Sequence, residues 1–325
     1  MQSKRPCAKR RCFGPLAAVL AALAGALLAD PLTNGPAPEP DSLRNDLETM
    51  LRHAERGEAD AQYRVGVVYD EGIGARRDAE QAARWYRKAA EQGNLEAQID
   101  LAVLLAAGDG VTRDRAEAAR WYRKAAERGV PRAQYVLALM LATGDGVPTN
   151  LVEAVTWFEK SAAQDVHDAQ LMLGIFYGEG RGVPRDAARA AAWFRLAADA
   201  GYPPAAYELG VLYANGEGVP ASYEEAFRWY RKAAEKGVAE AAYNLAFMYG
   251  RGQGVPLDLV NAYIWTERAV ALGSESAFLL RGKIMERMRP EEIVEAHRRE
   301  LEASHDRPAG ARAALVPAVR QQVKP

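Results

Sequence analysis

The histidines and cysteines are the residues of this sequence most suited to metal binding or catalysis. Four histidines are spread along the chain without the spacing of metal ligands. They are His53, His167, His297 and His305. Both cysteines, Cys7 and Cys12, lie near the N-terminus, so the rest of the chain has no disulfide framework. No acid–base pair recommends catalysis, and we predict a protein without enzymatic activity, metal site or cofactor.

Paired glycines and aromatic–basic segments are the next candidates for chemistry. The Gly-x-Gly pairs follow helical patterns and not strands, so we interpret them as helix stops and not as phosphate-binding loops. Arg84-Trp85-Tyr86-Arg87-Lys88 mixes aromatic and basic residues, as nucleic-acid-binding surfaces do. Its Trp and Tyr fall on an apolar stripe and its bases fall outside that stripe, which favours a structural role. The chain beyond residue 29 is also mildly acidic, with 37 basic and 43 acidic residues, so we expect no nucleic-acid partner.

Tryptophan recurs with a period of 36 residues. The six tryptophans are Trp85, Trp121, Trp157, Trp193, Trp229 and Trp265. Self-similarity at this period is the signature of a repeat array, and we interpret the tryptophans as its structural anchors.

Each unit predicts two short helices. The first carries apolar or small residues at spacings of four, five and eight and stops at the glycine pair. Asp78, Asp114, Asn150, Asp186, Ser222 and Asp258 then precede the second helix as candidate N-caps. A glycine follows most second helices, with Asp165 as the exception. Because each helix buries only part of its surface, we predict an all-α fold, a right-handed α-solenoid of antiparallel helix pairs.

The pattern resembles the Sel1-like repeat, a relative of the tetratricopeptide repeat. The matching residues of one unit are Ala205, Leu209, Gly210, Tyr213, Gly216, Gly218, Val219, Ala226, Trp229, Tyr230, Ala233, Ala234 and Gly237. The resemblance covers six full repeats in residues 60–275 and implies a scaffold that holds other proteins. Some bacterial members carry paired cysteines and are linked to β-lactam binding. This chain has no cysteine in its repeats, so the resemblance does not extend to that activity.

The segments outside the repeats are predicted from composition. Residues 1–29 combine five basic residues with a short apolar run and a small-residue cleavage site, as an export signal does. Residues 30–40 are a Pro-rich linker, 41–59 an N-terminal capping helix, 276–303 C-terminal capping helices and 304–325 a flexible tail. We expect export to a bacterial periplasm or cell envelope. An uncleaved membrane anchor in residues 13–29 is the alternative.

Positions that vary between units indicate where a partner binds. Counted from the leading alanine of each first helix, offsets three and ten point away from the packed face and vary between units. At offset three they are Arg64, Asp100, Val136, Met172, Glu208 and Asn244. At offset ten they are Glu71, Ala107, Thr143, Glu179, Asn215 and Arg251. We predict that they line a concave groove for a protein partner. An ordinary solvated face is the competing interpretation.

Offset six is apolar in every unit, which favours packing between repeats over an exposed groove. The residues are Val67, Val103, Leu139, Ile175, Val211 and Phe247. The sequence as a whole predicts a non-enzymatic protein–protein interaction scaffold. An envelope enzyme acting on cell-wall or β-lactam material and a membrane-anchored cytosolic adaptor are the alternatives.

Overall fold

The computed structural model describes residues 40–305 and the side chains of residues 47–302. The expected export signal, most of the linker and most of the tail therefore lie outside the described residues. Within them the chain is entirely helical, with fifteen α-helices and no strand. The fold is thus an all-α solenoid, as predicted.

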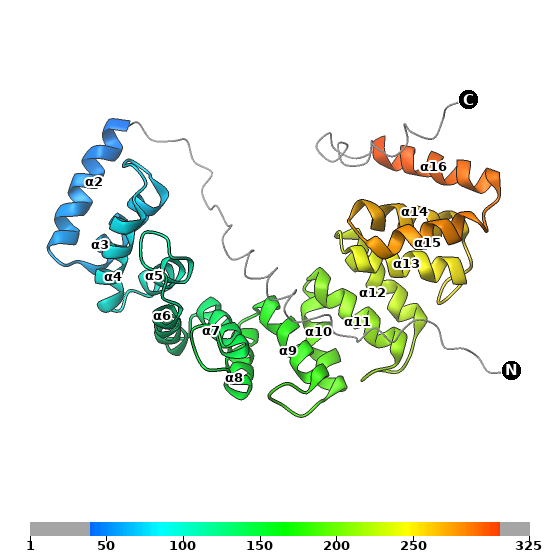
Figure 1. Cartoon of the computed structure of the whole chain (residues 1–325), viewed down its shortest axis with the longest axis horizontal. Helices are drawn as coiled ribbons and strands as arrows, with labels where there is room; N and C mark the ends of the chain where they lie inside the picture. The colour runs from blue at the N-terminus through cyan, green and yellow to red at the C-terminus, as the bar shows by residue number, and fades with distance from the viewer. Residues whose placement is uncertain (1–39, 306–325) are drawn as a thin grey trace. The chain divides into compact units, whose positions relative to one another are not determined.

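The helices form six pairs with additional helices at each end (Figure 1). The first helices of the pairs are α3 (Ala59–Glu71), α5 (Leu95–Ala107), α7 (Pro131–Thr143), α9 (His167–Glu179), α11 (Pro203–Asn215) and α13 (Ala239–Arg251). The second helices are α4 (Ala79–Glu91), α6 (Arg115–Glu127), α8 (Leu151–Ala162), α10 (Ala187–Asp199), α12 (Tyr223–Glu235) and α14 (Leu259–Ala271). The end helices are α2 (Pro40–Glu55), α15 (Glu275–Met285) and α16 (Pro290–His305).

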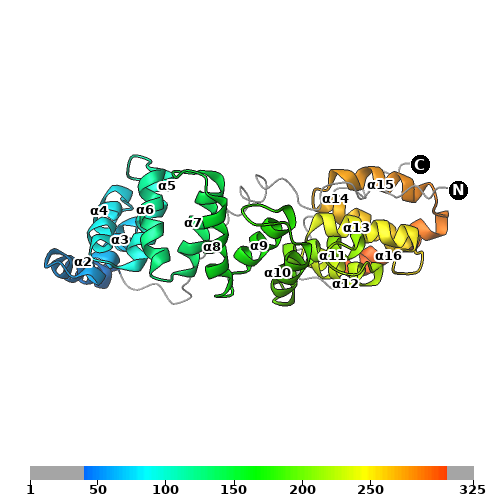
Figure 2. The same cartoon turned by 90° about the horizontal axis from the view of Figure 1, so that it is seen from below.

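The chain divides into two compact units. In its described part, the first unit holds α2–α9 and the second unit holds α10–α16. Within each unit every helix packs against the next, except that α16 packs against α14. Figure 2 shows α5–α8 side by side in the first unit. The core is made mainly by the leading alanines from Ala97 to Ala241 and by the aromatic residue that follows five of the six tryptophans, whereas Thr266 follows Trp265. Ala97, Phe158 and Ala205 are fully buried, for example.

The ends of the helices follow the predicted capping chemistry. The first glycine of each pair has left-handed backbone geometry and caps a first helix, as Gly108 does with a φ of 79°. All six candidate N-caps accept a hydrogen bond from the backbone N–H three residues later, such as Asp114 from Glu117 at 2.8 Å. These contacts confirm the predicted N-caps and helix stops.

In five of the six pairs, from Gly110 to Gly254, the second glycine lies against the preceding repeat. A Cβ added to Gly182, which has a φ of 68°, would lie 2.5 Å from the backbone carbonyl of Leu151 at the start of α8. Gly254 stands in the same relation to Tyr223 at the start of α12. This glycine therefore lets one turn contact the second helix of the previous repeat, a role that the sequence analysis did not assign.

Asp165 is the one described non-glycine residue with positive φ, at 60°. Asp165 follows α8 at the position that Gly129, with a φ of 90°, occupies after α6. Because left-handed geometry strains a residue with a Cβ, we expect Asp165→Gly to raise the free energy of unfolding by about 0.5–1 kcal/mol. Urea unfolding measures the change, with Gly129→Asp as the reciprocal variant. A loss of stability in Asp165→Gly would contradict this explanation.

The C-terminal helices differ in part from expectation. Ala296 of α16 is fully buried against Tyr263 and Ile264 of α14, as part of one apolar cluster. The sequence analysis predicted capping helices that reach residue 303, but Leu301, near that end, is 57% exposed. The packing of α16 against α14 therefore does not extend over the whole helix.

Candidate functional site

The tryptophans lie on the second helices and are mostly buried. Trp121, Trp157, Trp229 and Trp265 are at most 8% exposed, whereas Trp85 and Trp193 are half-buried. In four repeats, the lysine three residues after the tryptophan lies over the indole ring, with Lys124 Nζ 3.9 Å from the ring centroid of Trp121. The sequence analysis placed the basic residues of these segments outside the apolar stripe. These lysines cover the outer face of the ring, where a cation is attracted to the π-electrons.

In the first unit, two carboxylates each join the tryptophan of their own repeat to an arginine of the preceding repeat. Glu117 accepts a hydrogen bond from Trp121 Nε1 at 3.2 Å and forms an ion pair with Arg87 of the preceding repeat. Glu153 repeats this contact with Trp157 at 3.2 Å and with the Arg123 guanidinium at 2.5 Å. The hydrogen bond from Arg87 lowers the pKa of Glu117, and that from Arg123 lowers the pKa of Glu153. These groups hold repeats together, so the aromatic–basic segments serve the structure.

Four buried glutamines are structural residues that the sequence analysis missed. Each donates a hydrogen bond from Nε2 to a backbone carbonyl at the end of the preceding second helix, as Gln62 does to Ala54 at 3.0 Å. The others are Gln98 to Ala90, Gln134 to Ala126 and Gln170 to Ala162. Their spacing of 36 residues was the signal. The first helices of the second unit have Ala206 and Ala242 there instead.

The residues predicted to bind a partner lie on the first helices at offsets three and ten. Six of them are exposed, namely Arg64, Glu71, Ala107, Thr143, Glu179 and Arg251. Another five are half-buried, namely Asp100, Val136, Glu208, Asn215 and Asn244. The apolar residues at offset six, from Val67 to Phe247, are half-buried or buried. By helical spacing, offset minus one lies on the same side of the helix as offsets three, six and ten. We call these four positions the first-helix surface.

Met172 contradicts the prediction, because it is fully buried and cannot contact a partner directly. Ten consecutive residues of α9, from Ala169 to Gly178, are buried. A helix that is apolar all round is buried all round, so the alternation of packed and exposed positions fails in this repeat.

Charge is unevenly distributed over the first-helix surface. Offsets minus one, three and ten hold eight carboxylates but only three basic groups. The carboxylates are Asp60, Glu71, Glu96, Asp100, Asp168, Glu179, Glu208 and Glu240, and the basic groups are Arg64, Arg132 and Arg251. The surface therefore has the electrostatic character that attracts a basic partner.

Asp100 has the most perturbed carboxyl group of this surface. Its pKa is raised to about 6, mainly by burial and to a smaller extent by the charges of Asp70 and Glu96. A hydrogen bond from the Tyr63 hydroxyl and the charge of Arg132 act in the opposite direction. Burial and the carboxylate charge of Asp100 in turn raise the pKa of Tyr63. The hydrogen bond from Tyr63 and the charge of Arg132 therefore do not fully offset the burial of the Asp100 carboxylate, which lies on the surface predicted to bind a partner.

We expect Asp100→Asn to raise the free energy of unfolding at pH 7 by about 1–2 kcal/mol. With a folded pKa near 6, above its ordinary value of 3.8, Asp100 makes the native state bind more protons between these pH values. Its contribution therefore lowers stability as pH rises through that window, and the penalty is complete above pH 6. Urea unfolding from pH 4 to pH 7 should show the gain of the variant growing with pH. Glu96→Gln, an exposed change on the same helix, is the control, and a loss of stability in Asp100→Asn at pH 7 would contradict the prediction.

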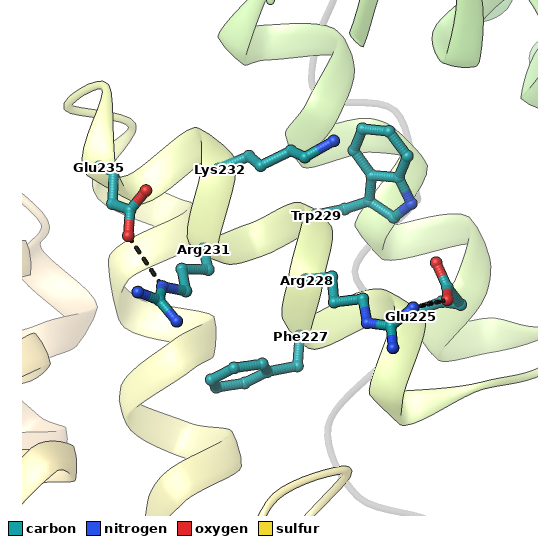
Figure 3. A pocket seen from close by; sticks show the side chains of 7 residues that line it. All are labelled: Glu225, Phe227, Arg228, Trp229, Arg231, Lys232 and Glu235. Atoms are coloured by element: carbon teal, nitrogen blue, oxygen red, sulfur yellow. Dashed lines mark hydrogen bonds and ion pairs between the residues drawn. The ribbon is translucent and has the colours of Figure 1, made fainter. Parts of the chain in front are cut away.

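A shallow hollow of about 410 Å³ lies beside α12 (Figure 3). Trp229, Lys232, Arg228 and Arg231 line it, and Lys232 extends over the indole ring. Arg228 pairs with Glu225 at 2.7 Å and Arg231 with Glu235 at 2.8 Å, so the two guanidinium groups already have partners.

The described histidines make local contacts. His53 lies 2.8 Å from Glu58, His167 lies 3.2 Å from Gln170, and His297 packs edge-on against Tyr263. Between residues 40 and 305, no group of three or more His, Cys, Asp or Glu side chains could hold a metal ion. None of the helices in that range is long and apolar enough to cross a membrane.

Comparisons with known proteins agree with this geometry. A family model described as Sel1 repeat matches residues 59–94, 95–130, 131–166, 167–202, 203–238 and 239–274. A search of curated proteins finds no match. The structure of c5321, a protective antigen of uropathogenic Escherichia coli with an SLR fold, is 35% identical with a TM-score of 0.71. The match covers 79% of this chain and 56% of c5321, so the chain spans just over half of that protein.

A Sel1 repeat protein from Oxalobacter formigenes is 29% identical, with a TM-score of 0.65 over 78% of this chain and 98% of that one. The matched repeats begin at the first helices of the structure and end after the second helices. Six matched repeats, each built as one helix pair, show that this chain belongs to the Sel1 repeat family.

Proposed function

We propose that this protein is a non-enzymatic scaffold that binds a partner protein on the first-helix surface. The Sel1 repeat fold is typically a protein–protein interaction scaffold, which supports the general function. The location is supported by the contrast between the two sets of helices. The second helices repeat tryptophans, four of them buried, and two of the repeat boundaries carry the same ion pair. The first helices instead change their exposed residues from repeat to repeat.

The observation that carries the proposal is the excess of carboxylates on that surface. The surface has eight acidic residues and three basic residues, and burial raises the pKa of Asp100. A group that costs folding stability is often kept because binding requires it. A basic segment of a partner protein complements this surface, and its charges would replace the water that Asp100 has lost.

Cross-linking in the native cell tests the proposed surface. A photoreactive amino acid placed at Glu71, Glu179 or Asn244 should capture the same partner from three repeats. The matched positions Arg84, Arg120 and Arg228 lie exposed on second helices and should capture it poorly. Capture from the second helices alone would place binding on the other side of the repeats.

We also propose that the protein is exported to a bacterial cell envelope. The basic start, short apolar run and small residues of residues 1–29 support this location. N-terminal sequencing of the cell-derived protein should therefore give a start near Leu27 or Asp30. An intact Met1 in the membrane fraction would favour an uncleaved anchor.

A further inference from the structure

A second hollow, of about 370 Å³, lies in the second unit and is lined by residues of α12, α13, α14 and α16. Three arginines from three helices contribute to its wall, namely Arg231 of α12, Arg268 of α14 and Arg299 of α16. Glu235 is the one carboxylate among the residues that line it. A hollow with such a lining has the electrostatic character of a site for an anion.

Asn261, on the wall of this hollow, stands at a position where three other repeats have a carboxylate. The counterparts, separated by multiples of 36 residues, are Glu117, Glu153 and Glu225. Glu117 and Glu153 each hold the arginine of the preceding repeat and the indole N–H of their own repeat. Asn261 instead donates its side-chain N–H to Asp258 at 2.7 Å. The boundary between the fifth and sixth repeats therefore lacks the carboxylate that joins arginine to tryptophan in the first unit.

Arg231 and Trp265 are the counterparts of the two groups that Glu117 holds together. Arg231 donates from Nε to Glu235 of its own helix at 2.8 Å, so this ion pair does not use its terminal nitrogens (Figure 3). Trp265 Nε1 donates no hydrogen bond to any residue that the structure describes. Both groups therefore retain donors that an anion in the hollow could use.

Arg299 brings a second guanidinium group to the hollow from α16. It donates from Nε to Glu295 at 2.7 Å, and Arg298 holds the same carboxylate at 2.8 Å. One negative charge thus serves two arginines. A guanidinium group has five N–H donors in a plane that matches both oxygens of a carboxylate, so Arg299 can bind a second carboxylate while it keeps the first.

We propose that this hollow binds a carboxylate group of a peptide ligand, at the place that a glutamate side chain of the protein occupies in the second and third repeats. The carboxylate accepts hydrogen bonds from Arg231 and Trp265 Nε1, and Arg299 adds a further donor. Tyr249 and Ile264, which also line the hollow, offer apolar contacts to the carbon atoms beside the carboxylate. The proposal is independent of the first-helix surface, which is acidic and attracts a partner of the opposite charge.

The indole N–H of Trp265 provides the readout, because hydrogen bonding changes its NMR signal. The full chain labelled with ¹⁵N-tryptophan gives one indole signal for each of its six tryptophans, and Trp265→Phe assigns the signal of Trp265. The probe is a tri-glutamate peptide that is acetylated and amidated at its ends. We expect it to shift the Trp265 signal saturably, with a dissociation constant on the order of 1 mM. The matching tri-glutamine peptide, which has no carboxylate, should leave the signal in place.

Asn261→Glu tests whether the ligand replaces the missing side chain. Without peptide, this variant should show the Trp265 signal near its peptide-bound position, and added peptide should shift it no further. Arg231→Gln should keep the free position of the signal and raise the dissociation constant about tenfold. Arg228→Gln is the matched control on the same helix, since Arg228 pairs with Glu225 and does not line this hollow. Its dissociation constant should stay within about twofold of the wild-type value.

A tri-glutamine peptide with a free C-terminus distinguishes the two sources of a peptide carboxylate. Binding of this peptide would assign the hollow to a chain end, whereas binding of the amidated tri-glutamate peptide alone would assign it to an acidic side chain. A Trp265 signal that no carboxylate peptide shifts at about 20 mM would overturn the proposal. Undiminished binding to both Asn261→Glu and Arg231→Gln would do the same. Inorganic phosphate acting at lower concentration than either peptide would contradict the choice of a carboxylate.

Discussion

Replacing Trp157 by alanine is expected to lower the free energy of unfolding by about 3–5 kcal/mol, the range for truncating a buried tryptophan. The indole is 7% exposed, donates a hydrogen bond to Glu153 and lies 4.0 Å from Lys160 Nζ. The substitution removes both contacts and leaves a cavity beside the ion pair between Glu153 and Arg123. Urea unfolding measures the loss.

The half-buried Trp85 provides the comparison for Trp157. It lies in the first repeat, and water already reaches part of its ring. Trp85→Ala should therefore cost less than Trp157→Ala, because less apolar surface is lost from the core. A larger loss at Trp85 would mean that burial does not decide how much each tryptophan stabilises the repeats.

Gly182→Ala is expected to cost about 3 kcal/mol or more. Left-handed geometry contributes about 1–2 kcal/mol of strain to a residue with a Cβ, and forced repacking adds about 1–3 kcal/mol. The added carbon would lie 2.5 Å from the carbonyl of Leu151, and a backbone group cannot move aside as a side-chain end can.

Gly129→Ala is the matched control for Gly182→Ala. Gly129 also has positive φ, at 90°, but no atom lies within 4 Å of its Cβ position. Only the backbone strain applies, so the loss should be about 1–2 kcal/mol. Equal losses in the two variants, measured by urea unfolding, would show that the contact between Gly182 and Leu151 has no energetic importance.

The repeat and the ends of its helices were predictable because they depend on local chemistry. Trp121 and its counterparts set the period, and Asp114 caps a helix through a backbone group three residues away. The second glycine of each pair was not explained from sequence. Its partner, such as Leu151 for Gly182, lies about 30 residues away in the previous repeat and is identified only by the packing.

The candidate surface was predicted less completely than the fold. Helical spacing identified the exposed positions of polar residues such as Arg64 and Glu71, because one side of α3 faces water. It failed at Met172, where apolar residues surround the whole of α9. The raised pKa of Asp100 was also not predictable, since it depends on burial and on Asp70 and Tyr63 of another helix.

Binding to the first-helix surface is tested most directly by the association rate of the cross-linked partner with charge-reversed variants. Glu179→Lys and Glu208→Lys should each slow association about tenfold at low salt and less at high salt, as expected for a basic partner. Arg84→Glu, an exposed reversal on a second helix, should leave the rate within about twofold. Unchanged association in both glutamate variants, with slow association in Arg84→Glu, would contradict the proposed surface.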